Sequence, residues 1–124
     1  MARDLLNDDL PYFVHFKAGT VVSFSSNMEC NDLPLYMRHG NPPRVMLEIF
    51  QDWLDYARKY EQGASRIDPT IHSHVFGRPV GMSVFQRMID VAKQADDIWI
   101  GTRSEAVKYI LAQRNGASAR AARG

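Results

Sequence analysis

Three short apolar segments, each followed by a pattern of helical periodicity, constrain the fold of this chain more than any other feature. The segments are residues 20–24, 66–73 and 97–100, and each contains β-branched or aromatic residues. A repeated succession of strand and helix favours parallel strands joined by right-handed crossovers. We therefore predict an α/β fold, a partial (β/α) barrel with about three parallel strand–helix units.

The three helical patterns have recognisable start and stop signals. The first begins after Asn41 with two prolines and ends before Gly63. The second spans residues 83–95, and the third opens on the capping-box pattern of residues 102–105 and runs to about Arg114. Apolar residues recur at helical spacing in the first of these helices: Met46, Ile49, Phe50, Trp53, Ala57 and Tyr60.

Chain length limits how much of a barrel this sequence can form. A closed eight-unit β/α barrel usually needs roughly 200 residues or more, and the chain has 124. We expect an N-terminal coil over residues 1–18, the partial barrel over 19–114, and a disordered tail of Gly, Ala, Ser and Arg over 115–124. An open barrel leaves an unpaired strand edge, which invites association.

Composition and charge point to an ordinary globular protein. The hydrophobic content of 45% and charged content of 23% are typical of one, and a net charge of +1 gives no reason to expect nucleic acid or a membrane as partner. No signal peptide or membrane span is evident. Cys30 cannot form an internal disulfide, so we expect a cytoplasmic location and a buried or inert thiol.

The end of the second strand carries the most telling side chains. His72 and His74 occupy alternate positions, which on a strand point to the same side. They fit a metal pair, a general acid with its partner, or histidines that merely pack against neighbours, and these alternatives stay open. The other histidines, His15 and His39, show no ligand spacing, so we predict no self-contained metal site.

Two further places follow predicted strands. Asn31 and Asp32 come after the first strand, where they can hold a substrate or orient a histidine, or can simply make a turn before Pro34. Arg78 can bind a carboxylate or ureido group with two parallel hydrogen bonds, or can form an ion pair within its turn.

The order and spacing of several segments resemble a known family. Residues 71–79, the helix that follows, and residues 97–105 together resemble the C-terminal part of polysaccharide deacetylase (NodB-homology) proteins, most closely the allantoinase-like branch. Residues 9–12 (Asp-Leu-Pro-Tyr) and 31–34 (Asn-Asp-Leu-Pro) are similar to segments of that branch. The resemblance spans about residues 8–112.

The resemblance implies a fold and a set of roles. The family fold is a distorted β/α barrel of about seven units, of which this chain would hold the last three. The implied activity is hydrolysis of carbon–nitrogen, non-peptide amide bonds in a small amide or amino-sugar substrate. His72 matches the histidine that acts as general acid toward the leaving group. The other matches are Asn31 and Asp32 in the loop facing the substrate, Arg78 and Pro79 in the shaping turn, and Trp99 and Arg103 at the closing strand and helix start.

Departures from the family pattern separate two hypotheses. Metal-binding members combine an early Asp-Asp motif with a later His-x-x-x-His pair, a combination that this sequence lacks, so we expect no cofactor in this chain and a divalent metal only in a completed site. The first hypothesis is a hydrolase fragment that needs an N-terminal barrel segment for activity. The alternative is a non-catalytic interaction module, derived from the same fold, that forms a homo-oligomer or binds another protein.

Overall fold

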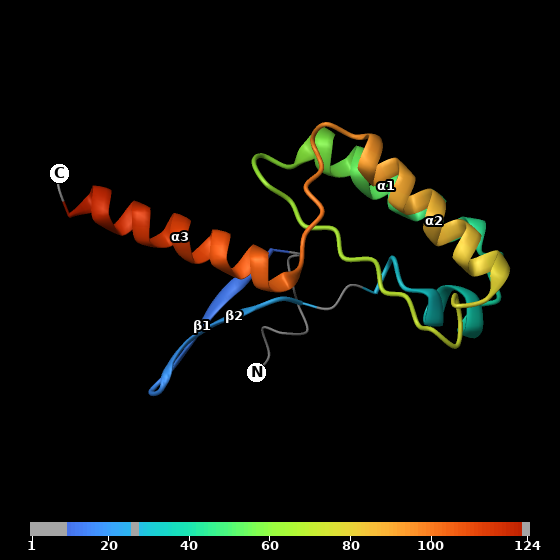
Figure 1. The fold of residues 1–124 in the computed structure, drawn as a ribbon, viewed down its shortest axis with the longest axis horizontal. Helices are drawn as coiled ribbons and strands as arrows, with labels where there is room; N and C mark the ends of the chain where they lie inside the picture. Colours follow the sequence, from blue (N-terminus) through green and yellow to red (C-terminus); the bar gives the residue numbers. More distant parts are fainter. Residues whose placement is uncertain (1–9, 26–27, 123–124) are drawn as a thin grey trace. The chain divides into compact units, whose positions relative to one another are not determined.

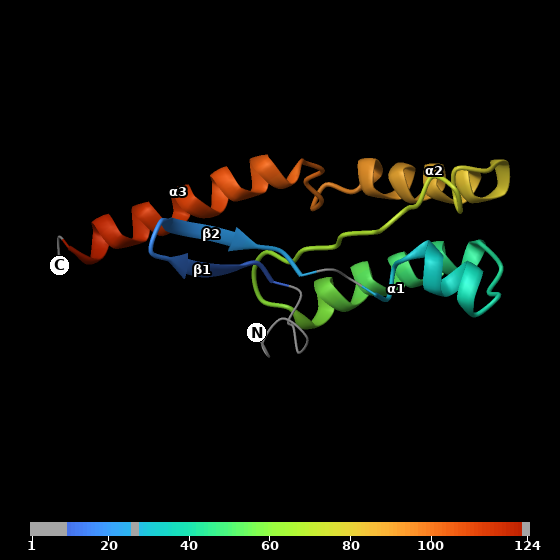
Figure 2. The same cartoon turned by 90° about the horizontal axis from the view of Figure 1, so that it is seen from below.

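The structure is a computed structural model that describes residues 10–25 and 28–122. Its elements are a β-hairpin, a short π-helix and three α-helices, so the fold is mixed helix and strand (Figures 1 and 2). The chain divides into two compact units, Met1–Gln94 and Ala95–Gly124.

The hairpin consists of β1 (Tyr12–Phe16) and β2 (Gly19–Ser23), which pair antiparallel from Tyr12↔Ser23 to Phe16↔Gly19. β2 confirms a strand in the first apolar segment, but its partner lies within the predicted coil, residues 1–18, and the two strands are not parallel. The two residues between the strands and the positive φ of Gly19 (148°) close a tight turn. This local turn pairs β2 with its immediate neighbour in sequence.

Two helices enclose the core of the first unit. α1 (Arg44–Tyr60) and α2 (Pro79–Gln94) pack against each other. Three residues of the predicted apolar face of α1, Met46, Phe50 and Trp53, are buried together with Leu54, whereas Tyr60 is 61% exposed. The π-helix η2 (Leu33–Arg38) precedes α1 and carries Tyr36, whose ring meets the buried Phe76 ring edge-on with centroids 6.0 Å apart. The buried apolar residues are Cys30, Met46, Phe50, Trp53, Leu54, Val75, Phe76, Val84, Met88 and Ala92.

The second and third predicted strands are not regular strands in the described residues. Residues 66–72 form an irregular segment, with one isolated parallel bridge between Asn31 and Thr70, and residues 97–100 are irregular. Pro69 lacks the N–H that a strand ladder uses, which limits pairing within the first of these segments. The described chain therefore has one parallel contact where the sequence predicts three parallel strand–helix units.

The second unit is dominated by α3 (Arg103–Ala121). Its predicted capping box is confirmed: Glu105 N–H donates to Thr102 Oγ1 at 3.2 Å, and Thr102 N–H donates to Glu105 Oε2 at 2.7 Å. The bond from the Thr102 N–H, together with a second bond that the Thr102 hydroxyl donates to the same carboxylate at 2.8 Å, lowers the pKa of the Glu105 carboxyl. The helix continues to Ala121, so the predicted disordered tail (115–124) is helical through most of its length, because alanine favours helix strongly. No helix among the described residues combines the length and apolar character that a membrane span requires.

Candidate functional site

Two segments distant in sequence lie side by side and create the candidate site. Thr70 N–H donates to the Cys30 carbonyl at 2.9 Å, and Asp32 N–H donates to the Thr70 carbonyl at 3.2 Å. These are the hydrogen bonds of the parallel bridge between Asn31 and Thr70. Because the segments run in the same direction, the bridge brings Asp32 next to His72.

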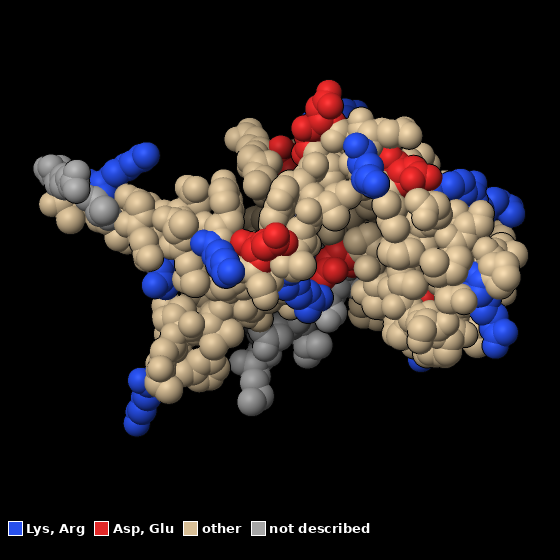
Figure 3. Space-filling view, viewed as in Figure 1, with Lys and Arg blue, Asp and Glu red and all other residues tan. Residues whose placement is uncertain are grey.

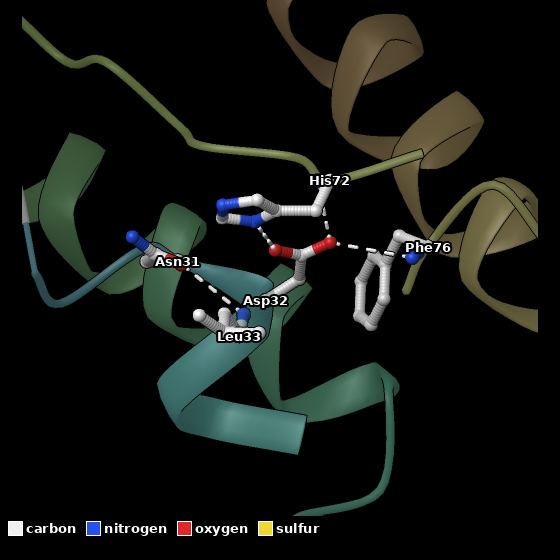
Figure 4. A network of polar contacts seen from close by, with 5 residues as sticks. All are labelled: Asn31, Asp32, Leu33, His72 and Phe76. Carbon is white, nitrogen blue, oxygen red and sulfur yellow. Dashed lines mark hydrogen bonds and ion pairs between the residues drawn. The ribbon is translucent and has the colours of Figure 1, made fainter. Parts of the chain in front are cut away.

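Asp32 is bound to the second segment through both of its carboxylate oxygens (Figure 4). Oδ1 lies 2.6 Å from His72 Nδ1. Oδ2 accepts the backbone N–H of His72 at 2.8 Å and that of Phe76 at 3.2 Å. Three donors therefore converge on one carboxylate. Both the ring and the backbone N–H of His72 bind Asp32, and we call this pair of residues the dyad.

The two members of the dyad differ sharply in exposure. The Asp32 side chain is fully buried, whereas 33% of the His72 side chain is exposed. An ionised carboxylate only accepts hydrogen bonds, so His72 Nδ1 carries the hydrogen that the pair shares. The other ring nitrogen, Nε2, points away from Asp32 (Figure 4). A histidine held in this way presents Nε2 outward in a fixed orientation, as proton donation or acceptance requires.

Local turns place both residues. Asn31 Oδ1 accepts the backbone N–H of Leu33 at 3.1 Å, which starts η2 directly after the bridge. On the other side, the His72 carbonyl accepts the N–H groups of Val75 (2.9 Å) and Phe76 (3.0 Å), folding the chain back toward Asp32. The turn chemistry predicted for Asn31 is thus present, and it supports the site.

His74 and Arg78 lie outside the dyad. The His74 side chain is exposed, and its ring meets the His72 ring edge-on with centroids 5.7 Å apart. It lies in a turn, so the alternation expected of a strand does not apply. Arg78 is exposed and makes no side-chain ion pair within the described chain, which leaves unsupported the interpretation that it pairs within its turn.

The side chains present do not form a metal centre by themselves. Among the residues that the structure describes, no three His, Cys, Asp or Glu side chains gather closely enough to hold an ion. Cys30 is buried, its Sγ lies 3.9 Å from the Met46 carbonyl, and burial raises its pKa to about 12. That thiol is therefore protonated near neutral pH, in agreement with the predicted inert cysteine.

Sequence reasoning missed the backbone part of the site. The N–H groups of His72 and Phe76 and the bridge through Thr70 depend on a turn and on a long-range pairing, neither of which leaves a residue pattern. It also missed Arg66, which joins Asp68 and Ser25 through its guanidinium. The carboxylate of Asp68, two residues further along the sequence, was the feature that could have suggested an ion pair with Arg66.

Charged side chains of both signs lie on one face of the chain. On the face drawn in Figure 3, acidic and basic side chains are interspersed over the unit that contains α1 and α2. This distribution agrees with the near-neutral net charge of +1.

Comparison with known proteins gives a likeness in structure. No protein-family model matches the sequence, and no curated protein matches it. The structure is similar to that of a probable polysaccharide deacetylase from Pseudomonas aeruginosa PAO1, with a TM-score of 0.70 and 22% sequence identity. The likeness covers 79% of this chain but 34% of that protein, so the chain spans about a third of its length. The shared feature is the fold.

Proposed function

We propose that this chain is the C-terminal part of a polysaccharide deacetylase-like hydrolase of carbon–nitrogen, non-peptide amide bonds. The single observation that carries the proposal is the Asp32–His72 dyad, which has a buried carboxylate and an outward Nε2. The fold likeness and the matching order of segments 31–34, 71–79 and 97–105 support it independently.

In this proposal His72 is the proton donor. Amide hydrolysis passes through a tetrahedral intermediate whose carbon–nitrogen bond breaks, and the electron pair of that bond remains on the departing nitrogen. His72 Nε2–H gives its proton to that nitrogen, so the imidazolium becomes neutral while Nδ1 keeps its hydrogen. Asp32 stabilises the imidazolium and holds the ring in orientation, as a buried carboxylate does for a catalytic histidine.

The remaining groups that amide hydrolysis needs must come from another segment. Attack on the carbonyl needs an activated water and groups that stabilise the oxyanion. The sequence has adjacent aspartates at 8–9 and 96–97 but no His-x-x-x-His pair, and its described residues do not assemble a metal site. We propose that an N-terminal barrel segment supplies these groups and the neighbouring strands of a parallel barrel.

The substrate class depends on groups around His72 Nε2. Arg78 is exposed, and its guanidinium can hold a ureido or carboxylate group through paired hydrogen bonds. His74 and Asn31 complete the substrate contacts that this chain offers. An allantoinase-like activity predicts a cyclic ureide as substrate, whereas the broader family predicts an acetylated amino sugar.

Complementation tests the proposal. The chain is mixed with the portion of the Pseudomonas aeruginosa protein that lies outside the structural match, and both substrate classes are assayed. We expect a complex, hydrolysis by the mixture, and a loss of several orders of magnitude with His72→Gln. His39→Gln is the matched control because His39 is exposed and lies at the end of η2. Absence of both binding and hydrolysis would refute the proposal.

A non-catalytic role in assembly is the second candidate. Trp99 and Ile100 are 64% and 59% exposed, and the hairpin has no third strand among the described residues. Exposed apolar groups and open strand edges promote association. Size-exclusion chromatography with light scattering tests this role: a stable oligomer whose assembly and partner binding are unaffected by His72→Gln would favour it over catalysis.

A further inference from the structure

Arg66 makes several side-chain contacts outside the dyad. Nη1 lies 2.8 Å from Asp68 Oδ2, and Nη2 donates to the Ser25 carbonyl at 2.7 Å and to Ser25 Oγ at 3.2 Å. The guanidinium also lies over the Phe24 ring, 5.6 Å from its centroid. Only 15% of the Arg66 side chain is exposed, and Ser25 is buried.

These contacts join the same two segments that carry the dyad. Ser25 precedes the segment that ends at Asp32, and Arg66 precedes the segment that ends at His72. The segments are connected at one end by Arg66 and Ser25, in the middle by the Asn31–Thr70 bridge, and at the far end by Asp32 and His72. A single bridge holds the two stretches together weakly, so the contacts of Arg66 with Ser25 add a second point of attachment between them.

A small displacement of either stretch is enough to break the dyad. The Asp32–His72 contact is 2.6 Å long and is lost when its atoms separate by about 1 Å more. The planar guanidinium satisfies Asp68 and Ser25 at once, and a lysine ammonium cannot reproduce that two-sided fork.

We propose that Arg66 is a positioning residue that attaches the stretch leading to His72 to Ser25 and thereby helps to hold Asp32 against His72. Its importance for catalysis rests on the proposed function, whereas its effect on the dyad can be measured in this chain without any substrate. The Arg66–Ser25 contact and the Asp32–His72 contact thus attach the same two parts of the chain to each other at two places.

Nuclear magnetic resonance of the whole chain tests this inference. A histidine Nδ1–H that donates to a carboxylate at 2.6 Å gives a proton signal far downfield, and Asp32→Asn identifies the His72 signal by abolishing or shifting it. We expect Arg66→Lys to weaken or remove that signal and to speed hydrogen exchange at the Asp32 and Thr70 amides at least tenfold, with helix content unchanged. Arg44→Lys is the matched control, because Arg44 forms an exposed pair with Glu48.

Two further variants keep the test decisive if Arg66→Lys unfolds the chain. Ser25→Ala removes the 3.2 Å bond to Oγ and keeps the Ser25 carbonyl as an acceptor, and Asp68→Asn weakens the ion pair while keeping the shape of the side chain. We expect a smaller loss of the His72 signal in both. An unchanged signal and unchanged exchange in folded Arg66→Lys, or in both weaker variants, would overturn the inference. Failure of hydrolysis in the complementation experiment would leave this result intact.

Discussion

At the scale of single residues, Asp32 is the position where we expect substitution to be tolerated least. Its carboxylate is fully buried and accepts three hydrogen bonds from His72 and Phe76. A buried charge is tolerated only where donors replace the water that it has lost, and here the donors are two backbone groups and one ring. The same residue therefore serves the stability of the unit and the orientation of His72.

Asp32→Asn is expected to lower the free energy of unfolding by about 2 kcal/mol, because charge-assisted hydrogen bonds become neutral and one amide hydrogen faces a donor. Urea denaturation measures the change. Asp52→Asn is the control, since Asp52 is exposed on α1 and should change stability by less than about 0.5 kcal/mol. Equal effects of the two substitutions would contradict this view of Asp32.

Cys30 is expected to resist alkylation in the folded chain. Burial raises its pKa from 9.0 to about 12, so little thiolate exists at pH 8, and the sulfur is inaccessible. Because the folded thiol keeps its proton to higher pH than the unfolded thiol, its contribution to stability is complete below pH 9 and declines between about pH 9 and 12.

Iodoacetamide labelling followed by mass spectrometry checks the prediction for Cys30. Modification should be slow at pH 8 and become rapid once urea unfolds the chain. Rapid labelling under native conditions would show that the thiol is accessible.

At the scale of elements, helices could be predicted from the sequence more successfully than sheet pairing. The spacing of Met46, Phe50 and Trp53 and the Thr102–Glu105 box depend on neighbours within a few residues, and the structure confirms both. Strand pairing depends on which segment lies alongside a strand in space, and the local sequence does not show this. The sequence therefore predicts a parallel sheet for β2, although β2 pairs antiparallel with β1. Asp32 and His72 were each identified as candidates, but their contact joins positions that no local pattern connects.

Two glycines in helices should respond to alanine in opposite directions. A Cβ added to Gly81 in α2 would lie 2.6 Å from Phe76 Cα, in the turn that donates to Asp32. Gly81→Ala should therefore lower the free energy of unfolding by about 1–3 kcal/mol. Gly116 in α3 has open space around it, so Gly116→Ala should increase helix stability by about 0.5–1 kcal/mol.

Thermal unfolding followed by circular dichroism separates the two glycine variants. The Gly81 variant should also shift the downfield His72 signal, which the Gly116 variant should leave unchanged. Two variants with the same direction of change would contradict the packing argument.

At the scale of the whole molecule, the core and the candidate site belong to one unit. Every buried apolar residue among those described precedes Ala95, as do Asp32, His72 and Arg66. The second unit contains α3 and has exposed apolar side chains, including Trp99 and Tyr109. The structural match covers about a third of the similar deacetylase.

Truncation after Gln94 should preserve the first unit. We expect the shortened chain to unfold cooperatively in urea and to keep the His72 downfield signal, because no buried apolar residue among those described is removed. The full-length chain under the same conditions is the control. Loss of both the cooperative transition and the signal would show that residues 95–124 are required for folding.

The separation of 40 positions between Asp32 and His72 has a consequence for the order of assembly. Closing a loop of that length costs roughly 3 kcal/mol of chain entropy. The Asp32–His72 contact should thus form late during folding. It should also disappear first when the molecule opens locally, while the helices persist.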